Sequence, residues 1–253
     1  MRGPSALLAR LHLAVAFLTR LPLPPPAEWP PGALAAAMPG FPLVGVLVGG
    51  IGAAVYAIAH MLLPPALAAT LALAATIAAT GALHEDGLAD VADGFGGGAD
   101  KERKLAIMKD SRIGSFGVVT LALALMLRSG ALSSLASPGL VAGALISAHA
   151  LARAAIPVVM QVLTPARDDG LGASAGRPDP ATAMTATLIA GAFALLLLPG
   201  TAAVAAMVGA AIGGGAVAVL ARRQIGGHTG DVLGAVEQAA ETLALLAIVG
   251  AVA

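Results

Sequence analysis

The chain has 253 residues, of which 58% are hydrophobic and only 11% charged, and its mean hydropathy is +0.90. A soluble domain carries about 25% charged residues, so this chain has too few polar side chains to cover a water-exposed globule, and much of its surface must face lipid. The 14 basic and 14 acidic residues leave no net charge, which argues against nucleic acid as a partner, and the lack of cysteine excludes disulfides and thiolate metal sites.

The first element expected along the chain is a helix over about residues 5–18. Its apolar residues recur at helical spacing around Arg10 and His12, which is typical of a helix lying in the membrane interface rather than crossing it. Six prolines between Leu21 and Pro31 end it. No cleavage site is recognisable, so this segment is interpreted as mature sequence rather than a signal peptide.

Seven apolar stretches follow, each about long enough to cross a bilayer as a helix. They do not alternate as the strands of a β-barrel would. The sequence therefore predicts an all-α, polytopic membrane helix bundle that forms a single domain over residues 1–253. The seven expected spans are Phe41–His60, Ala66–Leu83, Phe116–Leu135, Leu140–Leu163, Ala181–Leu198, Thr201–Leu220 and Val232–Val252.

Charge is distributed unevenly between the connections. Three polar connections, about residues 84–115, 164–180 and 221–231, follow the second, fourth and sixth spans, so alternation places them on one side of the membrane. Together with Arg2, Arg10 and Arg20 they hold 12 of the 14 basic residues, whereas the opposite connections carry no charge. The positive-inside rule predicts that these loops are cytoplasmic and that the C-terminus is outside, in an inner-membrane protein.

Two cations fall inside predicted spans. Arg128 lies past the middle of its span, and snorkelling to a ragged helix end is the favoured interpretation. Arg153 and His149 are one turn apart and share a helix face. Two readings stay open for them: a polar stripe that faces the bundle interior, or a structural pairing with Glu237 or Glu241.

The most informative segment is His84-Glu85-Asp86-Gly87-Leu88-Ala89-Asp90-Val91-Ala92-Asp93-Gly94. If it is helical, Asp86, Asp90 and Asp93 stand at i, i+4 and i+7 on one face. Carboxylates that converge in this way repel one another unless a cation lies between them, and oxygen ligands favour Mg²⁺ or Mn²⁺. A solvated acidic helix face is the alternative, but seven of the 14 acids lie between Glu85 and Asp110. His84 and Glu85 are candidates for proton transfer.

Three further polar segments carry candidate binding residues. Lys109, Asp110, Ser111 and Arg112 precede the third span and resemble a phosphate-binding turn, with positive-inside anchoring as the alternative. The glycine-rich stretch from Gly226 to Gly234 adds His228 and Asp231, followed by Glu237 in the last span. In the segment Arg167–Gly172, a plain surface turn is favoured over a ligand role.

Together these segments resemble one family, cobalamin synthase, the adenosylcobinamide-GDP ribazoletransferases. The resemblance rests on HEDGLADVADG with MKDSRIGSFG, and extends to Leu18–Pro22, Phe41–Gly45, Gly170–Gly172 and Gly226–Glu237. It departs at Val91 and Ser115, where the family commonly has Thr, and is loosest in the second polar loop.

The resemblance implies a Mg²⁺-dependent membrane transferase. It would join adenosylcobinamide-GDP to α-ribazole, or to its 5′-phosphate, giving adenosylcobalamin or its 5′-phosphate and GMP. In this hypothesis Asp86, Asp90 and Asp93 hold Mg²⁺ on the pyrophosphate, while Lys109 and Arg112 stabilise the leaving group. Either a carboxylate or His84 would deprotonate the ribazole hydroxyl. A homo-oligomer is left open.

Two other functions are compatible with the pattern. A transporter would place intramembrane Arg, His and Glu along a pathway, but the polar residues here concentrate in one-sided loops. A lipid-type phosphotransferase would use the same metal-dependent transfer of a phosphate group, with a different alcohol as the acceptor.

Overall fold

The computed structural model describes residues 4–24, 30 and 32–252, and helices form nearly all of the regular structure in this part of the chain. This confirms the predicted all-α bundle. The elements are α1 (Pro4–Leu18), α2 (Ala33–Ala37), η1 (Met38–Gly40), α3 (Phe41–His60), α4 (Pro65–Thr80), α5 (Leu83–Gly97), α6 (Lys101–Met108), α7 (Ser115–Leu135), α8 (Pro138–Val162), α9 (Leu171–Ser174), α10 (Pro180–Leu197), α11 (Gly200–Ile225) and α12 (Gly230–Val252).

Within the described part of the chain, six candidates are long and apolar enough to cross a bilayer, and they include α3, α7, α8, α10, α11 and α12. Counting α4 and α5 together adds a seventh, although these two helices are bent by 92°. The expected span Ala66–Leu83 is therefore wrong at its end, because the helix stops at Thr80. Gly81 and Ala82 both adopt left-handed backbone angles, with φ of 66° and 58°, which turns the chain into α5.

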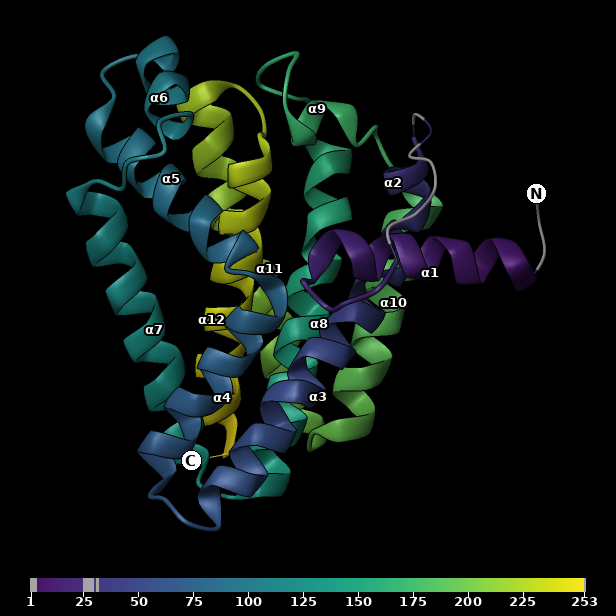
Figure 1. Ribbon diagram of the computed structural model, residues 1–253, viewed down its shortest axis with the longest axis vertical. Helices are drawn as coiled ribbons and strands as arrows, with labels where there is room; N and C mark the ends of the chain where they lie inside the picture. The colour runs from purple at the N-terminus through teal and green to yellow at the C-terminus, as the bar shows by residue number, and fades with distance from the viewer. Residues whose placement is uncertain (1–3, 25–29, 31, 253) are drawn as a thin grey trace.

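The polar connections gather at one end of the bundle. Figure 1 shows α6, α9 and the α11–α12 connection at that end, with the α3–α4 connection and the C-terminus at the other. The grouping inferred from alternation is thus confirmed for the described residues; Arg2 lies outside them. Which end faces the cytoplasm stays a prediction.

The N-terminal helix α1 runs across the bundle instead of along it (Figure 1). Its bounds, Pro4–Leu18, agree with the predicted helix over residues 5–18. It packs on α2 and α3, so its inner face covers the side of the bundle where α3 begins. This arrangement fits a helix that lies in the membrane interface.

Two helices form the centre of the bundle, α8 and α12, each with 72% of its most apolar stretch buried. The third polar connection is shorter than the expected residues 221–231, because α11 continues to Ile225 and α12 begins at Gly230. Arg222 and Arg223 stand in the last turn of α11, where cations stabilise the helix dipole. Only residues 226–229 link the two helices.

Candidate active site

The acidic segment forms helix α5, as the spacing of its aspartates predicts. Asp86 is exposed, Asp90 is half-buried and Asp93 is buried. The carboxylates of Asp86 and Asp93 lie close enough to Asp90 to interact with it electrostatically. A helical acidic face is therefore present, but its members differ in their surroundings.

Asp93 is bound to the start of α7. Its Oδ2 accepts the Gly114 N–H at 2.6 Å, and its Oδ1 accepts the Gly117 N–H at 2.9 Å. These are among the orphan donors of the first turn of a helix, which a carboxylate satisfies well. A Cβ on Gly117 would lie 2.5 Å from Asp93 Oδ2. The contact explains the glycine spacing in MKDSRIGSFG, while the metal role of Asp93 stays a prediction.

Helix α5 touches helix α12 almost without intervening side chains. A Cβ on Gly87 would lie 2.7 Å from the Asp231 carbonyl oxygen, and one on Gly234 would lie 3.3 Å from Gly87 Cα. This approach brings Asp231 within electrostatic reach of Asp86 and Asp90. Three carboxylates from two helices that are distant in sequence therefore interact electrostatically, and none of them is fully buried.

The second and third polar loops are tied together through the backbone. The His228 N–H donates to the Thr164 carbonyl at 2.9 Å, and the Ala166 N–H donates to the His228 carbonyl at 2.8 Å. Burial lowers the pKa of the His228 side chain below its usual value. His228, expected to bind substrate, contributes to the site through these backbone contacts and is not part of the cavity wall described below.

Thr229 caps α12 and orients Asp231. Its Oγ1 accepts the Val232 N–H at 3.2 Å and donates to Asp231 Oδ2 at 3.1 Å. The cap satisfies one of the unpaired donors of the first turn, and the second bond restrains the Asp231 carboxylate.

A chain of charges connects the first polar loop to the acidic cluster. Lys109 Nζ lies 2.6 Å from Asp169 Oδ2, Arg167 Nε lies 3.6 Å from Asp169 Oδ1, and Arg167 Nη2 lies 3.5 Å from Asp231 Oδ2. The hydrogen bond from Lys109 lowers the pKa of Asp169. Arg167 Nη1 is buried without a hydrogen-bond partner among the described residues. Residues 167–170 form a bend as expected, but Arg167 also pairs with Asp231; a ligand role for Arg167 stays a prediction.

Arg112 and Asp110 form an ion pair separate from the charges that link Lys109 to Asp231. Arg112 Nη2 is 2.6 Å from Asp110 Oδ2, and the Arg112 side chain is 86% exposed. The hydrogen bond from Arg112 lowers the pKa of Asp110 to about 2. Ser111, between them, is also exposed. The ion pair therefore holds Asp110 and Arg112 in one turn at the rim of the polar end. Phosphate binding by this turn stays a prediction.

A cavity of about 290 Å³ adjoins the carboxylates. Its polar lining consists of His84, Asp86, Arg167 and Asp231, and its apolar lining comes mainly from α1, η1, α3 and α8. The site is thus a composite of α5, the second polar loop and the start of α12, set against an apolar wall.

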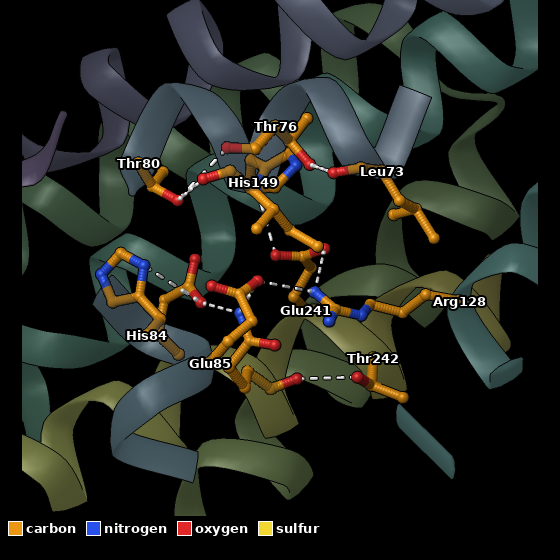
Figure 2. A network of polar contacts seen from close by, with 12 residues as sticks. Leu73, Thr76, Thr80, His84, Glu85, Arg128, His149, Glu241 and Thr242 are labelled. Atoms are coloured by element: carbon orange, nitrogen blue, oxygen red, sulfur yellow. Dashed lines mark hydrogen bonds and ion pairs between the residues drawn. The ribbon is translucent and has the colours of Figure 1, made fainter. Parts of the chain in front are cut away.

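A buried ionic network lies behind this site, between α5, α7, α8 and α12. Figure 2 shows Glu241 between Arg128 and His149, with Glu85 on the other side of Arg128. Arg128 Nη1 is 3.1 Å from Glu241 Oε1 and 3.6 Å from Glu85 Oε1, and Arg128 is only 1% exposed. The snorkelling expected for Arg128 is therefore wrong, because two carboxylates hold it inside the bundle.

The second half of the network joins α8 to α12 and to His84. Arg153 Nη1 lies 2.6 Å from Glu237 Oε1, and His149 Nδ1 lies 3.1 Å from Glu241 Oε2. Arg153 and His149 thus pair with Glu237 and Glu241, as one expectation had it, and they also face the bundle interior, as the other had it. Glu237, expected to bind substrate, is fully buried here; His84 Nδ1 lies 3.6 Å from its Oε2.

Comparison of the sequence with known proteins shows which family the chain belongs to. The family model described as cobalamin-5-phosphate synthase matches residues 10–249. The chain belongs to this family. It is 50% identical over 242 residues to an adenosylcobinamide-GDP ribazoletransferase of Bradyrhizobium diazoefficiens, covering 94% of this chain and 92% of the relative. No solved structure matches it.

Two further relatives carry the same name. One, from Mesorhizobium japonicum, is 47% identical and covers 96% of this chain and 94% of its own. Another, from Shewanella amazonensis, is 40% identical and covers 93% of each. The resemblance noted in the sequence is confirmed, and with it the assignment of the chain as a transferase enzyme of cobalamin synthesis.

Proposed function

We propose that this protein joins adenosylcobinamide-GDP to α-ribazole, or to α-ribazole 5′-phosphate, with Mg²⁺ as cofactor. A ribose hydroxyl oxygen forms a bond to the phosphorus on the cobinamide side of the pyrophosphate. The bond from that phosphorus to the GMP oxygen breaks, GMP leaves, and the hydroxyl proton passes to a base. The product is adenosylcobalamin or its 5′-phosphate. The observation that carries this proposal is the electrostatic interaction of Asp86, Asp90 and Asp231, with Arg167 paired to Asp231, in a member of this family.

The carboxylates have the ligand chemistry that a hard divalent cation prefers. Asp86, Asp90 and Asp231 offer oxygen ligands only, lie within electrostatic reach of one another, and are partly open to solvent, which suits Mg²⁺ that keeps waters and binds substrate phosphates. The oxygens of Asp93 already accept backbone N–H groups. We therefore assign the metal to Asp86, Asp90 and Asp231, with Asp93 positioning α7. When bound, Mg²⁺ would neutralise charge on the pyrophosphate.

The cations next to the carboxylates would receive the remaining phosphate charge. Arg167 Nη1 is a buried donor without a hydrogen-bond partner among the described residues, and guanidinium groups bind phosphate oxygens in a planar, directional way. Lys109 is linked to Arg167 because both pair with Asp169, and Arg112 lies at the exposed rim. We assign Arg167 and Lys109 to the pyrophosphate and Arg112 to the departing GMP.

Between the two candidates for the base, the structure favours His84 over Glu85. His84 lines the cavity, and its buried Nε2 has no hydrogen-bond partner among the described residues, so this nitrogen is available to a hydroxyl group of a bound substrate. Glu85 instead accepts a hydrogen bond from Gln238 at 3.2 Å and pairs with Arg128.

We also propose that the polar end of the bundle faces the cytoplasm and that the protein lies in the inner membrane.

Turnover by the purified protein in nanodiscs tests this proposal. With adenosylcobinamide-GDP, α-ribazole and Mg²⁺, we expect GMP and a corrinoid product in equal amounts, and neither product after chelation of the metal. Parallel reactions with α-ribazole 5′-phosphate establish which acceptor is preferred. A folded protein that releases no GMP with either acceptor would refute the assignment.

A further inference from the structure

The cavity beside the carboxylates is lined by two chemically different sets of side chains. Asp86, Arg167 and Asp231 are charged. An apolar set comes from three helices and packs in one hydrophobic cluster: Phe17 of α1, Phe41 of α3, and Ile156 and Met160 of α8. Phe41, Ile156 and Met160 are each at least 95% buried. A ligand that fills it must therefore combine a compact apolar part with a polar part.

The size of the cavity discriminates between the two substrates of the proposed reaction. A volume of about 290 Å³ is at the lower end of the range of about 300–1,000 Å³ for ligand pockets. A corrinoid macrocycle joined to a nucleotide cannot enter such a space. A benzimidazole riboside is much smaller, and its fused, uncharged rings match the apolar side chains, while its ribose hydroxyls match the charged ones.

We propose that this cavity is the subsite for α-ribazole, with the benzimidazole base against Phe41, Ile156 and Met160 and the ribose directed toward Asp86 and Asp231. This inference rests on the proposed function and deepens it by separating the two substrates. The larger substrate then approaches from the exposed rim, where Lys109 and Arg112 lie. The interfacial helix α1 acquires a role, because Phe17 closes the apolar wall.

A pair of variants on one helix tests the subsite. Ile156→Phe adds volume inside the cavity, whereas Val158→Phe adds the same ring two residues away, on a 40% exposed side chain that lines a different groove. We expect Ile156→Phe to raise KM for α-ribazole about tenfold and to leave KM for adenosylcobinamide-GDP within about twofold. Val158→Phe should change neither. Equal rises in both KM values for Ile156→Phe would overturn the proposal.

Enlarging the cavity should give activity on a larger substrate, which a loss of stability or folding would not produce. Met160→Ala should accept a riboside whose base carries one additional fused ring, which the unmodified protein should use at least tenfold less well. If Met160→Ala shows no gain for the larger base while still using α-ribazole, the subsite lies elsewhere. Failure of the unmodified protein to use either α-ribazole or its 5′-phosphate refutes the proposed function instead, so the two failures are distinguishable.

Discussion

At the scale of single residues, the buried charges of Arg128 and Arg153 show how an apolar bundle accommodates guanidinium groups. Each is only 1% exposed and each contacts a glutamate of α12, Glu241 or Glu237. A buried ion pair adds little stability relative to apolar side chains, but removing one partner leaves an uncompensated charge, which costs about 3–5 kcal/mol. The network therefore fixes the relative positions of α7, α8 and α12.

A double-mutant cycle measures this coupling. Arg128→Met and Glu241→Gln should each lower the free energy of unfolding by about 3 kcal/mol, because each leaves a buried group without its partner. The double variant should be less destabilised than the sum of the two by at least about 1 kcal/mol. Thermal unfolding in a fixed detergent provides the measurement. Strict additivity would show that the two side chains do not interact.

At the scale of elements, the docking of α5 on α12 creates the site. The contact depends on Gly87, which faces the Asp231 backbone directly. Because no side chain separates the helices there, Asp231 interacts electrostatically with Asp86, as the proposed metal site requires. The bend between α4 and α5 sets the direction from which α5 arrives.

Gly87→Ala tests whether this approach matters. The added methyl group would meet the Asp231 carbonyl oxygen at 2.7 Å, so the helices must separate, at a cost of about 1–3 kcal/mol. We expect a lower unfolding temperature and at least a tenfold loss of turnover. Gly50→Ala in α3 is the matched control, since a Cβ there meets nothing within 4 Å. If both variants behave alike, the close contact is not required.

The sequence predicted the elements better than the contacts between them. Continuous apolar runs and one-sided charge revealed the bundle and its polar end, and the i, i+4, i+7 spacing revealed the helical acidic face. The bend after Thr80 was missed because left-handed Ala82 has no sequence signature. Burial of Arg128 was missed because its partners, Glu85 and Glu241, are distant in the chain.

The site itself was only partly predictable for the same reason. Asp86 and Asp90 followed from local spacing, but Asp231 joins them through tertiary contact alone. Arg167 was set aside because it stands in the segment that matches the family least well. Its only sequence signal was its place in a polar loop on the same side as the acidic segment.

At the scale of the whole molecule, the polar end is expected to face the cytoplasm. The chain has no cysteine, so single cysteines can be labelled without background. Ser111→Cys at the polar end should resist a membrane-impermeant maleimide in intact cells, whereas Ser137→Cys at the opposite end should react; both positions are exposed. The reverse pattern would invert the topology.

The measurement that tests the central claim most directly is the Mg²⁺ dependence of turnover in Asp231→Asn. If Asp231 of α12 completes a metal site with Asp86 of α5, this variant should lose at least about 100-fold in rate at limiting Mg²⁺ and recover partly at high Mg²⁺. Asp168→Asn, an exposed acid of the second polar loop, is the control and should match the unmodified protein. Unchanged turnover of Asp231→Asn at limiting Mg²⁺ would contradict the composite metal site.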